Sequence, residues 1–264
     1  TKIKAIVTMN LGGYPENIEY FNHLRKKFKC LLIEDACHAL GAKYKIKNIL
    51  YAVGQCAHSD ICVFSMHPLK TITSGEGGII TTKNKDIYNR ILKLRSHGIE
   101  RNIINHWKYE IKEQGFNYRL SDINCALAIS QFQKMNTFID YRKKVFNLYR
   151  KLFQKSDFIT FPTYSTNNFP SYHLVIAQFN FKNLNQTKDK FLEYLKKNKI
   201  YAQFHYIPIY KFKLCKNKKK LLFSEKYFEQ TISLPIYFNL KNSHIQRVVK
   251  VINQFYKRNI HYAK

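Results

Sequence analysis

The N-terminal part of the chain alternates short apolar segments with a helical pattern, and this order restricts the possible fold more than any other feature. Residues 3–9 form a β-rich apolar segment, residues 15–28 have helical spacing, and residues 31–34 predict a short buried strand. This order predicts a βαβ unit. Two further predicted strands, at 60–64 and 78–82, extend it into a mostly parallel sheet within an α/β fold.

The remainder of the chain predicts a bridging helical region and a second, smaller α/β domain. Ser121 is placed to cap a helix that runs through residue 132, and the helical period resumes from 138 to 153. We therefore expect one domain over residues 1–130 and another over 131–264. The further elements expected are a helix at 87–94, strands at 172–179 and 200–204, helices at 188–197 and 244–255, and an irregular linker at 162–170.

Composition allows a globular enzyme and indicates no membrane segment. The 264 residues are 45% hydrophobic, which is enough for a substantial core. No run of 18 or more apolar residues occurs, and the first residues lack the pattern of a signal peptide, so we expect a cytoplasmic protein. The six cysteines include no CxxC pair, which favours reduced thiols and predicts no metal site.

The formal charge of +28 would favour an anionic partner such as a nucleic acid or a membrane surface. However, the lysines are spread along the whole chain among Asn and Ile, and no nucleic-acid-binding motif accompanies them. A biased genome explains this pattern better than a binding patch does. We expect neither a nucleic acid nor a membrane partner.

Chemistry-bearing residues follow two of the predicted strands. The segment 31–38 ends in Asp35 and His38, and Lys70 lies in a loop between the strand at 60–64 and a glycine-rich turn at 75–78. Open parallel sheets place ligand-binding groups at the carboxyl ends of their strands. An acid, a histidine and a lysine in these places suggest a pyridoxal phosphate site, although an isolated aspartate or lysine would more often cap a turn or lie at the surface.

The same segments resemble a known family. Residues 34–98, 116–122, 205–210 and 233–235 together look like the DegT-type sugar aminotransferases, which are pyridoxal-phosphate-dependent transferases of fold type I. The resemblance covers nearly the whole chain. It implies an incomplete large domain with a mostly parallel sheet, followed by a small C-terminal α/β domain. The family's N-terminal portion, which helps to hold the cofactor phosphate, has no counterpart here, and we expect weak cofactor binding by this chain alone.

The resemblance also implies roles for four residues around the cofactor. Asp35 would keep the pyridine nitrogen protonated, and Lys70 would form an imine with the cofactor aldehyde and shuttle the proton. His38 would contact the phenolic oxygen or the ring, and Ser65 would bind the phosphate. A structural role remains open for His38 and for Ser65. Glu34 precedes Asp35 and points to the opposite face by strand alternation, so we expect it to be structural.

Two further segments are implied to reach the substrate side. Asn117 would enter the partner subunit's site toward the phosphate, and Arg119 would meet anionic groups of the substrate, which implies a homodimer. His205 and Tyr206 resemble the family's substrate segment from the small domain. Without the resemblance, residues 117–119 would be interpreted as a surface loop.

Within the family, segments 64–78 and 203–210 are most similar to the branch that acts in pseudaminic acid biosynthesis. This implies amino transfer from glutamate to C4 of UDP-2-acetamido-2,6-dideoxy-β-L-arabino-hex-4-ulose. Another nucleotide-linked ketosugar stays open as the acceptor, because a few pocket contacts decide between sugars. A noncatalytic partner that lacks the family's N-terminal portion is the alternative from a different functional class.

Overall fold

The computed structural model describes residues 2–15, 17–102, 104–105, 107–215 and 219–260. The chain divides into two compact units. Unit 1 comprises Thr1–Thr137 with Ser165–Ser171, and unit 2 comprises Phe138–Tyr164 with Tyr172–Lys264.

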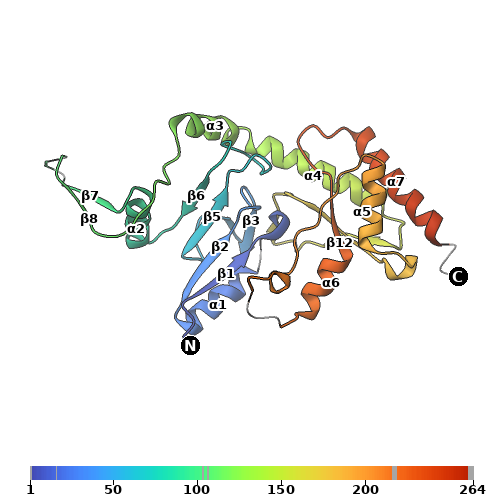
Figure 1. The fold of residues 1–264 in the computed structure, drawn as a ribbon, viewed down its shortest axis with the longest axis horizontal. Coiled ribbons are helices and arrows are strands. Elements are labelled where there is room, and N and C mark those ends of the chain that lie inside the picture. The colour runs from blue at the N-terminus through green and yellow to red at the C-terminus, as the bar shows by residue number, and fades with distance from the viewer. Residues whose placement is uncertain (1, 16, 103, 106, 216–218, 261–264) are drawn as a thin grey trace. The chain divides into compact units, whose positions relative to one another are not determined.

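Unit 1 is built on a four-stranded sheet with the order β1-β2-β5-β6 (Figure 1). Strands β1 (Ala5–Met9), β2 (Leu31–Asp35) and β5 (Ile61–Ser65) run parallel, and β6 (Gly78–Thr81) is antiparallel to β5. The helix α1 (Ile18–Phe28) connects β1 to β2 and packs against both strands. The predicted βαβ unit and the mostly parallel sheet are therefore confirmed.

Local sequence explains where α1 begins and ends. The side chain of Asn17 accepts a hydrogen bond from the backbone N–H of Tyr20 and caps the first turn. The helix therefore begins at Ile18, three residues after the start expected at residue 15. Lys29 ends the helix in a left-handed conformation with φ of 48°, and three basic residues in the last turn complement the helix dipole.

The core of unit 1 lies between α1, the sheet and the loop that follows β2. Along β2, burial alternates, so that Leu32 and Glu34 are buried while their neighbours are more exposed. The buried apolar residues of this core are Ile18, Leu32, Ala36, Ala39, Ala42, Tyr44, Val53, Cys56, Cys62 and Phe64.

Two hairpins in unit 1 were not predicted from the sequence. The first consists of β3 (Lys43–Ile46) and β4 (Ile49–Ala52), and β10 (Asn168–Phe169) adds to it beside β3. The second consists of β7 (Ile99–Arg101) and β8 (Tyr109–Ile111). The expected linker at 162–170 therefore contributes a strand. The 3-10 turn η1 (Leu11–Gly13) and helices α2 (Lys85–Arg95) and α3 (Asp122–Phe132) complete this unit, with Ser121 capping α3 as predicted.

Unit 2 is a small α/β unit with an antiparallel sheet of order β12-β11-β9. Its elements are α4 (Met135–Leu152, whose first residues belong to unit 1), β9 (Ile159–Thr160), β11 (Val175–Phe179), η2 (Lys182–Leu184), α5 (Lys188–Lys197), η3 (Ile209–Lys211), α6 (Leu222–Gln230), β12 (Thr231–Leu234) and α7 (Asn242–Ile260). Residues 200–204 form only an isolated bridge, Gln203 with Ser233, instead of the expected strand.

Aromatic side chains fill the centre of unit 2. Phe191 on α5 is 1% exposed, and its ring centroid lies 4.9 Å from those of Phe179 and Phe255 and 5.6 Å from that of Phe181. These tilted pairs connect α5 to β11 and α7, so the aromatic cluster holds the layers of the unit together.

Both outer strands of the four-stranded sheet present unpaired edges within the described residues. Val7 on β1 is 65% exposed and Ile80 on β6 is 48% exposed. Unpaired apolar edge strands offer backbone donors and acceptors to a further strand.

Among the helices in the described part of the chain, none has the length and apolar character needed to cross a membrane.

We predict that Phe191→Ala lowers the free energy of unfolding by about 3–5 kcal/mol, because it removes a fully buried ring and leaves a cavity. Urea denaturation followed by circular dichroism measures the loss. Phe223→Ala is the matched control: this phenylalanine is 89% exposed on α6, and its replacement should change the free energy by less than about 0.5 kcal/mol. Equal losses in the two variants would contradict the assigned core.

Candidate active site

Two neighbouring parallel strands bring the predicted acid and the lysine loop to the same edge of the sheet. Strand β2 ends at Asp35 and β5 ends at Ser65, and Asp35 is in register with Val63. Oδ1 of Asp35 accepts a hydrogen bond of 3.1 Å from the backbone N–H of Cys37, which fixes the carboxylate at the start of the following loop. The carboxyl ends of parallel strands are where such folds place ligand groups.

The loop that carries Lys70 is closed by backbone hydrogen bonds at its base. The N–H of Met66 donates to the carbonyl of Gly77 over 2.8 Å, and the N–H of Ser74 donates to the carbonyl of Met66 over 3.1 Å. Lys70 itself closes a turn by donating its N–H to the carbonyl of His67 over 2.9 Å. The loop thus holds Lys70 between β5 and β6.

Gly77 shows why glycine is needed at the end of this loop. Its φ is +136°, and a Cβ atom there would lie 2.8 Å from a side-chain carbon of Leu120. A larger residue would be strained in its backbone and would have to displace that leucine.

Lys70 lies close enough to Asp35 and Cys37 for their charges to interact. Burial lowers the pKa of the half-buried Lys70 ammonium below its ordinary value, and the negative charges of Cys37, once its thiol is ionised, and of Asp35 oppose this shift. Burial, reinforced by Asp35, raises the pKa of the Cys37 thiol to about 11, whereas Lys70 acts in the opposite direction. The result is an amine that loses its proton more readily than a surface lysine, beside an acid and a neutral thiol.

His38 is buried and has a defined tautomer. Its Nδ1 accepts a hydrogen bond of 3.3 Å from the backbone N–H of Gly12, so a neutral imidazole carries its proton on Nε2. Its backbone carbonyl accepts a hydrogen bond of 2.8 Å from the hydroxyl of Ser171. His38 is therefore a fixed side chain whose Nε2–H is a hydrogen-bond donor.

Ser65 and Glu34 differ in their surroundings. The hydroxyl oxygen of Ser65 accepts a hydrogen bond of 3.3 Å from the backbone N–H of His67, which leaves its own proton to donate. Glu34 is buried, and its carboxylate accepts hydrogen bonds from Ser59 at 2.5 Å and from Asn10 at 3.3 Å. These contacts give Glu34 the structural role expected from strand alternation.

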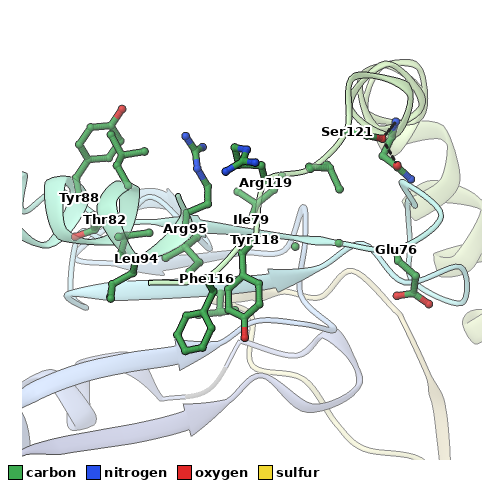
Figure 2. A pocket seen from close by; sticks show the side chains of 18 residues that line it. Glu76, Ile79, Thr82, Tyr88, Leu94, Arg95, Phe116, Tyr118, Arg119 and Ser121 are labelled. Carbon is green, nitrogen blue, oxygen red and sulfur yellow. Dashed lines mark hydrogen bonds between the residues drawn. The ribbon is translucent and has the colours of Figure 1, made fainter. Parts of the chain in front are cut away.

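A separate cavity of about 1060 Å³ lies beside β6 in unit 1 (Figure 2). Its lining comes from β5, β6, α2 and the segment that leads into α3, and consists of Val63, Glu76, Gly77, Gly78, Ile79, Ile80, Thr82, Tyr88, Ile91, Leu92, Leu94, Arg95, Phe116, Tyr118, Arg119, Leu120, Ser121 and Asn124. Asp35 and Lys70 do not belong to this lining. The cavity is thus distinct from the acid and lysine cluster.

Arg119 lines this cavity, whereas Asn117, between the lining residues Phe116 and Tyr118, does not. Figure 2 shows the side chains of Arg95 and Arg119 pointing to the same side, while the stacked rings of Phe116 and Tyr118, 4.8 Å apart, point to the other. Asn117 forms an isolated bridge with Ser96, and both Asn117 and Arg119 are exposed. Both residues are thus available to a ligand or to another chain.

His205 and Tyr206 belong to unit 2. Nδ1 of His205 is hydrogen-bonded to the hydroxyl of Ser233 on β12 at 2.8 Å, and Tyr206 is half exposed. This bond anchors the segment to the edge of the antiparallel sheet.

Sequence analysis missed two neighbours of these residues. Cys37 interacts with both Asp35 and Lys70, and Arg95 lines the cavity together with Arg119. Cys37 lies two residues after Asp35, so strand-end spacing was a usable signal. Arg95 is one of two basic residues in the last turn of α2, and only the packing distinguishes it from Lys93.

We predict that Asp35→Asn lowers the pKa of Lys70 further, because the nearby negative charge that raises this pKa is lost while burial remains. Above the lowered pKa, Lys70 would be mostly neutral. NMR of ¹³C-methylated lysines measures the titration. Asp86→Asn on the exposed start of α2 is the matched control and should leave the titration of Lys70 unchanged; identical titrations in the two variants would contradict the Asp35–Lys70 interaction.

Comparison with known proteins finds a family match over most of the chain. Residues 1–253 match the DegT/DnrJ/EryC1/StrS aminotransferase family. A UDP-4-amino-4,6-dideoxy-N-acetyl-beta-L-altrosamine transaminase of Campylobacter jejuni is 34% identical over 248 residues, which cover 92% of this chain and 64% of that protein. A GDP-perosamine synthase of Escherichia coli O157:H7 is 28% identical over 260 residues, with 97% and 66% covered. The chain therefore spans less than two thirds of the length of these curated relatives.

The fold is also shared with solved structures. Helicobacter pylori PseC, described as an aminotransferase involved in the biosynthesis of pseudoaminic acid, superposes with a TM-score of 0.88 at 29% identity and covers 97% of this chain and 67% of its own. A Streptoalloteichus hindustanus aminotransferase, TlmJ, reaches a TM-score of 0.86 at 21% identity. These neighbours confirm that the chain has the expected transferase fold, fold type I.

Proposed function

The chain belongs to the DegT/DnrJ/EryC1/StrS aminotransferase family, and on this premise we propose that the protein transfers an amino group from glutamate to a nucleotide-linked 4-ketosugar. The observation that carries the proposal is the placement of Lys70 and Asp35 at the carboxyl ends of adjacent strands, close enough to interact electrostatically. Because nucleotide sugars and glutamate are cytoplasmic metabolites, we place this reaction in the cytoplasm.

The proposed acceptor is UDP-2-acetamido-2,6-dideoxy-β-L-arabino-hex-4-ulose. Support comes from the 34% identity to the Campylobacter altrosamine transaminase and from the likeness to Helicobacter PseC. The second candidate is another nucleotide-linked ketosugar, and the similarity to a GDP-perosamine synthase favours it. Both substrates call for the same amino transfer at a ketone carbon.

The residues at the ends of β2 and β5 fit pyridoxal phosphate. The donor set consists of a carboxylate, a half-buried amine with a lowered pKa, a hydroxyl and a neutral imidazole with its proton on Nε2. Asp35 would hold the protonated pyridine nitrogen, Lys70 would hold the aldehyde carbon covalently, and Ser65 would donate to the phosphate. His38 would donate from Nε2 to the phenolic oxygen or contact the ring.

When bound, pyridoxal phosphate supplies an electron sink for the charge left on the substrate carbon after proton removal. The chain's own contribution is proton transfer and orientation. Since burial lowers its pKa, Lys70 is better suited than a surface lysine to accept a proton and to return it at a neighbouring carbon. Asp35 is oriented by the hydrogen bond that its Oδ1 accepts from the N–H of Cys37.

Two exposed segments complete the proposal. Asn117 and Arg119 would reach the site of a second subunit, the amide toward the phosphate and the guanidinium toward anionic groups of the substrate. The exposure of both side chains, and the position of Arg119 at a cavity that Lys70 does not line, support action in another subunit of a homodimer. His205 and Tyr206 of unit 2 would contact the sugar.

We predict that incubation with pyridoxal phosphate, followed by borohydride, leaves a covalent adduct on Lys70 that mass spectrometry locates after proteolysis. Lys70→Ala should abolish this labelling, and Lys83→Ala, which changes an exposed lysine after β6, should not. An unlabelled Lys70 in folded protein would favour the noncatalytic alternative instead.

We also predict that subunits with different defects complement each other. Lys70→Ala and Arg119→Ala should each abolish or strongly reduce amination of the UDP-ketosugar by glutamate. Mixed and reassembled, they should recover about a quarter of the wild-type activity, because half of randomly mixed dimers contain one intact site. No recovery would mean that Arg119 acts within its own subunit, and the proposed sharing of sites would be wrong.

A further inference from the structure

Lys188 is a buried lysine in unit 2 that takes no part in the proposed amino transfer. It is 8% exposed, and its ammonium lies 3.5 Å from the ring centroid of Phe228 and 4.3 Å from that of Phe204. It also donates a hydrogen bond to the backbone carbonyl of Phe228. Burial lowers the pKa of Lys188, as expected for a cation that has left water.

The position of the Lys188 ammonium shows which helix it stabilises. Lys188 is the first residue of α5, where the helix dipole disfavours a positive charge. Its ammonium instead meets the C-terminal turn of α6, where carbonyls lack partners within the helix and the dipole favours a cation. Lys188 therefore caps α6 rather than supporting its own helix.

The ring of Phe204 connects Lys188 to the segment that carries His205 and Tyr206. Phe204 immediately precedes these residues and makes an edge contact with Phe228 at 5.4 Å. On β12, Ser233 holds the same segment through two backbone hydrogen bonds with Gln203, of 3.2 and 2.7 Å. The segment thus has two attachments, one to a strand and one to the buried ammonium.

We propose that Lys188 is a positioning residue that sets the conformation of segment 203–206 through Phe204. The inference rests on the proposed function, in which His205 and Tyr206 contact the sugar of the nucleotide-sugar acceptor. Loss of the ammonium would release Phe204 and the end of α6 while the aromatic core around Phe191 stays packed. The consequence for the enzyme is a higher KM for the ketosugar at an unchanged extent of cofactor labelling on Lys70.

Hydrogen exchange measured by mass spectrometry tests this on the chain itself. In Lys188→Met, which keeps the length of the side chain but removes its charge and donor, amide exchange across residues 203–206 and 228–230 should accelerate about tenfold. Exchange across β11 should stay at the wild-type rate. Lys190→Met, two residues along and exposed, is the matched control and should change neither region. Uniform acceleration throughout unit 2, or none at 203–206, would overturn the proposal.

A second variant covers the case in which Lys188→Met does not fold. Phe204→Leu keeps the ammonium but removes the ring that it contacts, and it should produce the same local acceleration at 203–206. Steady-state kinetics of both variants should show a KM for the UDP-ketosugar raised about tenfold with kcat nearly unchanged. A wild-type chain that transfers no amino group would count against the proposed function, whereas the exchange comparison would still decide the role of Lys188.

Discussion

The parallel pairing of β2 with β5 is the constraint on which the candidate site depends. The register that sets Asp35 opposite Val63 places the carboxylate and the start of the lysine loop at one edge of the sheet. Strand alternation then sends Glu34 to the other face, where Ser59 and Asn10 satisfy it. A shift of one residue would exchange these two acids, which would turn Asp35 to the opposite face and leave the longer side chain of Glu34 at the site.

Electrostatics at this edge follow from two opposing effects. Desolvation favours a neutral Lys70, whereas the charge of Asp35 favours the ammonium, and burial dominates because the lowered pKa is the net result. The same desolvation keeps Cys37 as a thiol, so it adds no second negative charge beside Asp35. One anion and one readily deprotonated amine are the combination that a protonated heterocycle and an aldehyde require.

The sequence was informative where local pattern and tertiary role coincide. Residues 31–33 form a short apolar run that ends in the acids Glu34 and Asp35, so both the strand and the candidate site at its end could be predicted. Ser121 marked a helix start by its capping side chain. The hairpin β3–β4 was missed because its two-residue turn, Lys47-Asn48, contains no glycine, and β7–β8 was missed because each of its strands is only three residues long. Strand β10 was unpredictable in principle, since its partner β3 is more than a hundred residues away in sequence.

The same distinction explains why some site residues could be expected only through resemblance. Asp35 and Lys70 follow strands, and their grouping can be argued from topology alone. Arg119 and His205 lie in irregular segments, and their surroundings depend on contacts such as the cavity beside β6 or the bond to Ser233. In the proposed function, the chemistry of amino transfer rests on backbone pairing within unit 1, whereas recognition of the sugar rests on side chains of segments such as 203–206. Substitutions of those side chains would then change the acceptor without disturbing the acid and the amine, which is how one fold can serve several ketosugars.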